Sequence, residues 1–276
     1  MVLRTGIHAT MLGDALTPEG FERAHQAGVR CLEFPLGERG LDPGHPNQVK
    51  RIGRDLSGTG LAAWSLHADF GPKLDLGGPY PEARRAGIAM ILLAARVLAD
   101  VGGKVVVIHP GVGGFEDGER PQRVRACRES VEQLLDESEH LPVRFAVENM
   151  LPGHIGDRAS ELVALLAWLP QNRIGFCYDT GHARLCPDGL EIARCMKGRM
   201  ITVHLQDNLG EGDAHLMPGD GTVDWEVVAR MLDEADYRGP YVFETALPTP
   251  EEVIRRAHET AHRLDSLRNK PARRSR

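Results

Sequence analysis

The sequence predicts a single (β/α)8 TIM barrel, and three observations support this fold class. Short aliphatic runs alternate with longer helical patterns eight times along the chain, as in parallel sheets whose strands are joined by helices. The length of 276 residues suits such a barrel, which needs roughly 250. No glycine-rich phosphate turn follows the first predicted strand, so a closed barrel is favoured over an open doubly wound sheet.

The predicted strands are short aliphatic runs, and the predicted helices show the spacing of an apolar face. We expect strands at residues 2–8, 31–34, 62–67, 104–109, 144–148, 174–179, 200–205 and 241–244. We expect helices at residues 18–27, 47–57, 81–101, 121–140, 160–169, 190–196, 225–235 and 250–267. The third of these helices begins with a proline and ends before Gly102 and Gly103, the usual punctuation of a helix. One domain is expected over residues 1–267, followed by a basic, disordered tail over residues 268–276.

Side chains alternate in the expected strands, which indicates two faces. The residues assigned to the helical layer are apolar: Trp64, Leu66, Phe176, Tyr178, Ile201, Val203 and Leu205. The residues assigned to the barrel interior are small or polar: Ala63, Ser65, His67, Cys177, Asp179, Thr202 and His204. Small inward neighbours would leave space above them for ions and a ligand.

The composition argues against several classes of protein. Hydrophobic residues make up 42% and charged residues 26%, an ordinary balance for a soluble globular domain. No apolar run approaches the ~20 residues of a membrane span, and the N-terminus lacks the features of a signal peptide. The net charge is −6, and outside the tail 28 basic side chains face 39 acidic ones, which disfavours a nucleic-acid partner. The five cysteines form no CxxC pair, so we expect a cytoplasmic protein with reduced thiols.

Six consecutive predicted strands end with a side chain that can bind a metal. These strand ends are His67, His109, Glu148, Asp179, His204 and Glu244. In a barrel such ends converge at the C-terminal face, so we expect them to surround one cavity. Further candidates follow two of these strands: His182, Asp213 and His215. Mixed histidine and carboxylate ligands suit Zn, Mn, Co or Fe better than Ca. We therefore expect at least one divalent ion, with Glu148 able to bridge two.

Other polar residues are assigned more modest roles. Glu33 follows the second strand, and the sequence leaves it open between a substrate contact and a structural ion pair. Cys31 and Cys177 are expected to be small core residues. The remaining histidines are assigned no function: His8, His25, His45, His140, His154, His258 and His262.

Several short segments resemble the xylose isomerase-like TIM-barrel superfamily. They are Ser65-Leu66-His67-Ala68, Val107-Ile108-His109-Pro110-Gly111, Val147-Glu148-Asn149, Asp179-Thr180-Gly181-His182-Ala183, His204-Leu205-Gln206-Asp207-Asn208 and the stretch over residues 213–221. The superfamily contains sugar isomerases and epimerases, and also AP endonucleases of the endonuclease IV type. The resemblance runs over nearly the whole chain, and its motifs are specific for the superfamily but weak for any one activity.

The resemblance implies two different ligand sets. In the sugar epimerases, one Mn, Co or Mg ion is held at the positions of Glu148, Asp179, His204 and Glu244. In the endonucleases, three zinc ions are held by nine ligands, which match those four together with His67, His109, His182, Asp213 and His215. The endonuclease pattern continues its strand-five glutamate with Asn-Thr, whereas Met150 follows Asn149 here.

The function expected from the residues and the resemblance is a divalent-metal-dependent isomerase or epimerase of a sugar, keto-sugar or related hydroxy-carbonyl compound. Glu148 and Glu244, on strands across a cavity from each other, would move a proton next to a carbonyl through a metal-stabilised enediolate. His67, His109 and His182 are candidate substrate contacts as well as candidate ligands.

Three alternatives remain open at this stage. One is a zinc-dependent AP endonuclease, which is disfavoured because the loops over residues 68–79 and 208–225 carry a single basic residue, Lys73. Another is a keto-sugar lyase or dehydratase that uses the same site. The third is a metal-binding barrel without turnover. The sequence leaves open the substrate and its phosphorylation, the identity and number of the ions, and whether the protein forms a homo-oligomer.

Overall fold

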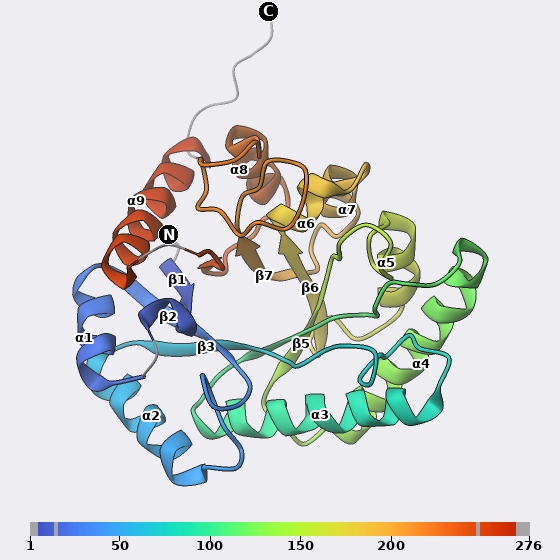
Figure 1. The fold of residues 1–276 in the computed structure, drawn as a ribbon, viewed down its shortest axis with the longest axis horizontal. Helices are drawn as coiled ribbons and strands as arrows, with labels where there is room; N and C mark the ends of the chain where they lie inside the picture. The colour runs from blue at the N-terminus through green and yellow to red at the C-terminus, as the bar shows by residue number, and fades with distance from the viewer. Residues whose placement is uncertain (1–4, 14–15, 247–248, 269–276) are drawn as a thin grey trace, which may run out of the picture.

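Eight parallel strands close into a barrel in the order of the chain, β1 to β8. The computed structural model describes residues 5–13, 16–246 and 249–268, and Figure 1 shows helices around the barrel. The strands are β1 (Thr5–His8), β2 (Val29–Pro35), β3 (Ala62–His67), β4 (Val105–Ile108), β5 (Arg144–Glu148), β6 (Ile174–Asp179), β7 (Met200–Leu205) and β8 (Tyr241–Phe243). The closure between β1 and β8 confirms the predicted fold class.

At least one helix follows each strand, and two helices, α6 and α7, follow β6. They are α1 (Pro18–Gln26), α2 (Pro46–Thr59), α3 (Pro81–Asp100), α4 (Arg120–Glu137), α5 (Ala159–Leu166), α6 (Thr180–Leu185), α7 (Gly189–Cys195), α8 (Trp225–Glu234) and α9 (Pro250–Arg268), with the short 3-10 turns η1 (Ala9–Leu12) and η2 (Asp117–Glu119). Every predicted element is present, with bounds that agree within about three residues for those fully described. Residues 2–4 of the first predicted strand and residues 269–276 of the predicted tail lie outside the described residues, so the domain boundary stays a prediction.

Two strands end one residue earlier than predicted. Strand β4 ends at Ile108 and β8 ends at Phe243, so His109 and Glu244 directly follow their strands. Both side chains still line the cavity at the C-terminal face. The small shift in bounds therefore leaves them where a strand end would place them.

Helix α6 was not predicted, because six residues are too few to show an apolar period. It begins directly after β6, where the side chain of Asp179 accepts a hydrogen bond of 2.7 Å from the backbone N–H of His182. This is the usual contact of an N-terminal cap. His182 thus lies on a helix rather than in a loop, and the cap fixes its place relative to Asp179.

Irregular pairing changes which side chains fill the barrel. The register shifts between Leu32 and Glu33 against β3, and again between Phe176 and Cys177 against β7. As a result Trp64 and Ile201 pack against the interior residues Val105, Val107, Ala146 and Cys177. The prediction that Trp64 and Ile201 face the helices is therefore wrong. Ala63, expected inside, belongs to the main core between strands and helices.

The bulges close the lower end of the barrel. Trp64 stands near the start of β3, and its indole N–H donates a hydrogen bond of 3.2 Å to Thr202 Oγ1 near the start of β7. A β-bulge inserts one residue and turns the following side chains to the other face. Large side chains therefore fill the barrel interior near the starts of the strands. The polar side chains at the strand ends that were predicted to face inward lie above them.

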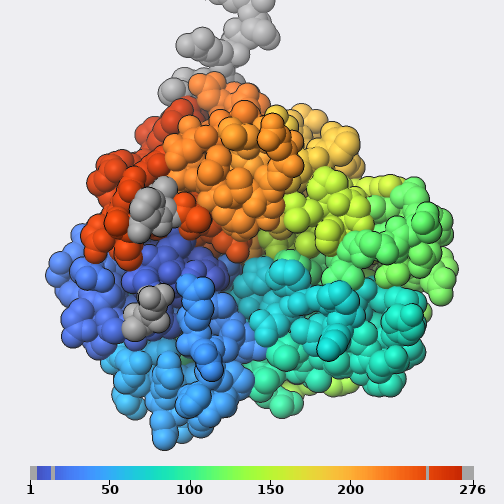
Figure 2. All heavy atoms as spheres, in the orientation of Figure 1, coloured from blue at the N-terminus to red at the C-terminus, as the bar shows by residue number. Residues whose placement is uncertain are grey.

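The remaining apolar positions pack as predicted between the sheet and the helices. Leu66, Phe176, Tyr178, Val203 and Leu205 are all fully or almost fully buried there. Figure 2 shows the face of the barrel that the loops after the strands cover. There the orange segment between β7 and α8 borders the centre, beside the teal segment between β3 and α3. Among the described residues, no helix combines the length and the apolar character that crossing a membrane would require.

Candidate metal centre

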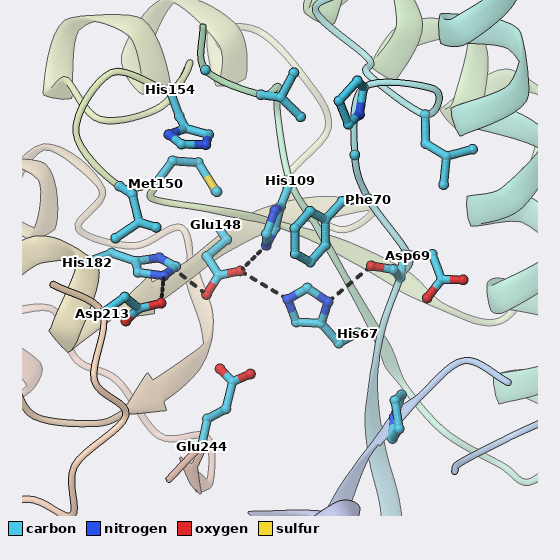
Figure 3. A pocket seen from close by; sticks show the side chains of 18 of the residues that line it. His67, Asp69, Phe70, His109, Glu148, Met150, His154, His182, Asp213 and Glu244 are labelled. Atoms are coloured by element: carbon cyan, nitrogen blue, oxygen red, sulfur yellow. Dashed lines mark hydrogen bonds and ion pairs between the residues drawn. The ribbon is translucent and has the colours of Figure 1, made fainter. Parts of the chain in front are cut away.

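Glu148 occupies the centre of the candidate site. Its side chain ends β5, is 1% exposed, and presents its two oxygens to different neighbours (Figure 3). Oε1 lies 2.8 Å from Nδ1 of His204, whereas Oε2 lies 3.1 Å from Nε2 of His109 and 3.3 Å from Nε2 of His67. One carboxylate therefore joins two groups of possible ligands, and its bridging of two ions stays a prediction.

The first group, the central cluster, consists of Glu148, Asp179, His204 and Glu244. One ligand atom from each lies within 4.8 Å of the others. Nδ1 of His204 is 3.1 Å from Glu244 Oε2 and 3.9 Å from Asp179 Oδ2. Three carboxylates and one imidazole match the donors preferred by Mn, Mg, Co and Zn. These residues thus fit a divalent ion, in the set that the resemblance implied.

The second group, the histidine cluster, consists of His67, His109 and Glu148. Their ligand atoms also lie within 4.8 Å of one another. The rings of His67 and His109 meet edge to face, with centroids 4.9 Å apart. This group could hold a second ion on the other oxygen of Glu148.

The third group, the Asp213 group, consists of Asp213 with His182 and His215. Nε2 of His182 lies 3.4 Å from Asp213 Oδ2, and Nε2 of His215 lies 3.1 Å from it. Each histidine donates its Nδ1–H to a backbone carbonyl, that of Asn149 at 2.8 Å and that of Glu244 at 2.9 Å. Such second contacts orient ligating histidines in metal sites. All nine predicted ligands therefore gather at one place.

A cavity of about 820 Å³ opens above these groups. Seven of the nine candidate ligands line it: His67, His109, Glu148, His182, Asp213, His215 and Glu244. Asp179 and His204 are fully buried beneath them. A small molecule in this cavity would therefore reach Glu244 and the open side of Glu148.

The charges of the central cluster depend on one another. Burial works against ionisation of Glu148, but the charge of His204 and hydrogen bonds from the surrounding histidines outweigh it, and the Glu148 pKa lies well below its ordinary value. Burial likewise opposes a charged His204, yet Cys177, Glu33 and Glu148 raise its pKa well above the ordinary value. Burial raises the pKa of Asp179 to about 6. The cluster thus favours a positive charge at its centre, as a cation site must.

The outer histidines differ in charge. Against the effect of burial, contacts with Glu148 raise the pKa of His67 to about 9. Burial instead dominates at His109 and lowers its pKa to about 4. His109 is therefore a neutral imidazole, the form that coordinates metal, while His67 would release a proton on coordination.

Glu33 is a structural ion pair rather than a substrate contact. It is fully buried on β2, where Oε1 lies 2.9 Å from Nε2 of His204 and Oε2 accepts a hydrogen bond of 2.6 Å from Ser65. The contact occupies the ring nitrogen of His204 that faces away from the central cluster. Glu33 therefore aims Nδ1 of His204 at Glu148 and Glu244.

The long segment between β7 and α8 carries Asp213 and His215, and Asp207 holds it in place. The buried carboxylate of Asp207 accepts hydrogen bonds from the backbone of Asn208, Gly219 and Val223 and from the indole N–H of Trp225, at 2.9–3.0 Å. Gln206 donates a bond of 2.6 Å to Asp213 Oδ1. Neither residue was predicted to have a role, although both directly follow the strand that ends with His204 and Leu205.

Two histidines to which the sequence assigned no function also line the cavity. His8 is the last residue of β1, and its position at a strand end was a usable signal. His154 lies between β5 and α5, and no sequence pattern marks it. Its backbone carbonyl accepts a hydrogen bond from Arg120, which also pairs with Asp157 and Glu161. Contacts distant in sequence thus set the path of this loop.

Comparison with known sequences agrees with this geometry. A family profile described as "xylose isomerase-like TIM barrel" matches residues 21–269. An uncharacterised protein of Sinorhizobium fredii is 26% identical over 80% of this chain and 79% of its own length. A rhizopine catabolism protein of Rhizobium meliloti is 29% identical over 84% of this chain and 75% of its own. A probable endonuclease 4 of Mycobacterium leprae is 30% identical, over 54% of this chain and 60% of its own.

Solved structures with the same fold include sugar epimerases. A D-tagatose 3-epimerase-like protein superposes with a TM-score of 0.82 at 18% identity, and the match covers 97% of this chain and 98% of the other. D-allulose 3-epimerase from Methylomonas gives a TM-score of 0.78 at 20% identity, with 95% and 96% covered. At such low identity the similarity establishes the fold.

Proposed function

Because the chain belongs to the xylose isomerase-like TIM-barrel family, we propose that it is a divalent-metal-dependent isomerase or epimerase of a sugar, keto-sugar or related hydroxy-carbonyl compound. One observation carries the proposal: Glu148 and Glu244 approach Nδ1 of His204 to 2.8 and 3.1 Å from strands β5 and β8. The two carboxylates thus meet at one candidate ion position and also border the cavity. The sugar 3-epimerases of similar fold support the same class of substrate.

The two carboxylates would divide the proton transfers. A bound divalent ion would supply positive charge that stabilises the negative charge formed when a proton next to a carbonyl is removed. The pKa of Glu244 lies below its ordinary value, because the charge of His204 and a hydrogen bond from it outweigh burial. Glu244 is therefore a carboxylate at neutral pH and accepts the proton on one side of the substrate. Glu148 holds or returns the proton on the other side.

The histidines at the rim would position the substrate. His182 lines the cavity with Nδ1 bonded to the Asn149 carbonyl, and its Nε2, which lies 3.4 Å from Asp213 Oδ2, would turn to a substrate oxygen or an ion. His67 and His109 stand beside Glu148 in the same cavity. In the proposal they contact the hydroxyl groups of the substrate unless a second ion occupies the histidine cluster.

A zinc-dependent AP endonuclease is the second candidate function. The gathering of all nine ligands favours it, and so does the similarity to a probable endonuclease 4 over about half of the chain. Duplex DNA would need cationic side chains around the site to neutralise phosphates. Among the described residues, the cavity lining contains no Lys or Arg. We therefore rank this candidate below the epimerase, together with the lyase and the metal-binding barrel without turnover.

Deuterium uptake tests the proposal directly. Mn-loaded protein is incubated in heavy water with a panel of ketoses and keto-acids, and exchange at the carbon next to the carbonyl is followed by NMR. Glu148→Gln and Glu244→Gln should each lower the exchange rate by about 100-fold or more, the usual contribution of a positioned acid or base. Glu211→Gln, in the exposed β7–α8 segment, is the matched control and should exchange normally.

Two results would contradict the proposal. Absence of exchange with every compound, in protein shown to contain Mn, would remove its basis. Efficient incision of a duplex with one abasic site by zinc-loaded protein, lost in Glu148→Gln, would instead establish the endonuclease. A lyase would show exchange together with a dehydrated or cleaved product.

A further inference from the structure

A second cavity lies between helices α6, α7 and α8, on the outer side of strand β6 (Figure 1). We call it the outer cavity, and its lining comes from these three helices, from Tyr178 of β6, and from residues 186–188 and 222–224 beside the helices. Its volume of about 620 Å³ lies within the range of small-molecule sites, roughly 300–1,000 Å³. Among the described residues, it shares no lining residue with the cavity above the metal centre. The outer cavity is therefore a separate candidate site.

Tyr178 places a hydrogen-bond donor at this cavity. The side chain is 1% exposed and belongs to the lining, and within the described ranges its hydroxyl has no hydrogen-bond partner. Buried tyrosine hydroxyls usually find a partner, because an unpaired buried polar group costs free energy. Burial raises the pKa of Tyr178 above its ordinary value, so the hydroxyl keeps its proton at neutral pH. An acceptor on a ligand in the outer cavity would supply the missing partner.

The acidic groups of the outer cavity already have partners. Asp188 accepts a hydrogen bond of 3.0 Å from the backbone N–H of Ala159. Asp224 caps α8, where its side chain accepts two backbone N–H bonds of 3.0 Å. Glu191 lies 3.6 Å from the guanidinium of Arg194. A bound cation is therefore not needed to compensate these carboxylates.

Arg184 of α6 differs, because its charge has no partner of opposite sign. Its Nε donates a hydrogen bond of 3.0 Å to Thr222 Oγ1, which holds the guanidinium at the exposed edge of the outer cavity. In the part of the chain that the structure describes, no carboxylate forms an ion pair with it. A guanidinium presents planar pairs of N–H groups that match a carboxylate. A ligand that carries a carboxylate would therefore be held at this edge.

The remaining surface of the outer cavity is largely apolar. Ala183 on α6, Leu190 on α7 and Val227 on α8 contribute to it, together with Val223 just before α8. Leu190 is 43% exposed, so the protein itself leaves part of this apolar surface uncovered. Apolar surface beside a few polar groups of fixed position is typical of small-molecule sites.

We propose that the outer cavity binds a small amphipathic organic acid. The carboxylate of the acid pairs with Arg184, its apolar body covers Leu190, and an oxygen distant from the carboxylate accepts the hydrogen bond of Tyr178. Helix α6 separates this site from the metal centre, since Ala183 lines the outer cavity whereas His182 lines the cavity above the metal centre. The ligand is therefore distinct from the substrate of the proposed function.

Three probes test this site in calorimetric titrations of the full, Mn-loaded chain. 4-Acetylbenzoate carries a carboxylate and a carbonyl, 4-ethylbenzoate lacks the carbonyl, and 4-methylacetophenone lacks the carboxylate. We expect 4-acetylbenzoate to bind about fivefold or more tightly than each of the others, the usual effect of one hydrogen bond in a protein. Tyr178→Phe should lower the affinity for 4-acetylbenzoate to that for 4-ethylbenzoate. Arg184→Gln should lower it to that for 4-methylacetophenone.

Two variants outside the outer cavity serve as controls. Arg230→Gln removes an exposed arginine of α8 that is not part of the lining. Phe70→Ala alters the cavity above the metal centre and leaves the outer cavity unchanged. Neither should change the affinity for any of the probes. Unchanged thermal unfolding of Tyr178→Phe would show that its fold is intact, and Arg184→Gln, at an exposed position, tests the site even if Tyr178→Phe is unstable.

Several results would overturn the inference. Equal affinities for the three probes would mean that neither polar group contributes to binding. An affinity for 4-acetylbenzoate that survives both Tyr178→Phe and Arg184→Gln, or that is lost in Phe70→Ala, would place the probe elsewhere. Absence of binding at millimolar probe would show that water alone satisfies the hydroxyl of Tyr178. The proposed function would stand in each case, because deuterium exchange tests it separately.

Discussion

A single ion pair beneath the site, between Glu33 and His204, orients the imidazole ring of His204. Glu33 does not belong to the central cluster, yet it lies 2.9 Å from the far nitrogen of His204. Glu33→Gln keeps the shape but loses the charge. We expect its affinity for Mn to fall by about 10- to 100-fold, as is usual when a second contact of a metal-ligating histidine is lost. Calorimetric titration measures the affinity.

Glu38→Gln is the control for Glu33→Gln, since Glu38 is exposed and lies shortly after β2. An Mn affinity that is unchanged in Glu33→Gln would show that the ring of His204 is held by its ligands alone. A loss of the whole fold would be visible in circular dichroism, and Ser65→Ala, which removes a partner of Glu33, would then test the same contact more gently.

Ion binding should release protons at neutral pH. The pKa of His204 lies well above its ordinary value despite burial, because of the acidic groups around it, so the ring carries a proton when no ion is bound. Coordination requires a neutral ring, and affinity must therefore rise with pH. Titrations in two buffers of different ionisation enthalpy should show about one proton or more released per ion. Identical heats in both buffers would contradict this prediction.

Residue types at strand ends predicted which side chains lie close together, because the C-terminal ends of all strands in a barrel converge at one face; that these side chains bind an ion stays a prediction. The nine predicted ligands came from strand ends and the segments that follow them; seven of them line the cavity, and Asp179 and His204 are buried directly beneath it. Pairing partners were harder to predict. Whether Glu33 faces His204 or the substrate depends on the register of β2 against β3. The residue types in these strands do not predict that register.

The long segment after β7 is the element on which the Asp213 group depends. The buried carboxylate of Asp207 accepts hydrogen bonds from three backbone N–H groups of this segment and from the indole N–H of Trp225, the first residue of α8. Asp207→Ala would leave these donors buried without partners, at about 1–3 kcal/mol each where water cannot replace the bond. We expect a loss of unfolding free energy in urea and weaker binding of any ion held by Asp213. Glu211→Ala, exposed in the same segment, should change neither.

A result in which Asp207→Ala keeps full stability would mean that water replaces the carboxylate, and the segment would then be far less constrained than its hydrogen bonds indicate. Asp207→Asn retains one carbonyl oxygen, so its free energy of unfolding should lie between those of the wild type and Asp207→Ala.

The elements themselves were predictable, whereas their irregularities were not. Apolar periods located the strands and the longer helices, since those patterns repeat over many residues. Trp64 and Ile201 defied the alternation because each lies at a bulge, and one extra residue reverses the face of its neighbours. Helix α6 was not predicted, because the cap at Asp179 stabilises it and its six residues show no apolar periodicity.

At the scale of the whole molecule, an ion in the central cluster would connect four strands. Glu148, Asp179 and His204 stand on β5, β6 and β7, and Glu244 directly follows β8. An ion that binds the folded chain but not the unfolded chain raises the free energy of unfolding by about 2.7 kcal/mol when the free ion concentration is 100 times Kd. Removal of metal with a chelator should therefore lower Tm, and added Mn should restore it.

Glu148→Gln supplies the control, because its Tm should respond little to Mn or chelator. Equal Tm values for chelated and Mn-loaded wild-type protein would contradict the prediction and would indicate that no tightly held ion contributes to the folded state.

The pairing of β1 with β8 has a consequence for how the chain is made. Thr5 lies beside Tyr241 in the finished barrel, so the first strand must wait for the last before its outer edge is covered. At 5–20 residues per second, a ribosome takes roughly 10–50 s to deliver the stretch between them. During that interval the nascent chain displays an unpaired strand edge, the kind of surface that chaperones shield. Newborn copies of this protein should therefore depend on such help far more than refolding of the finished chain does.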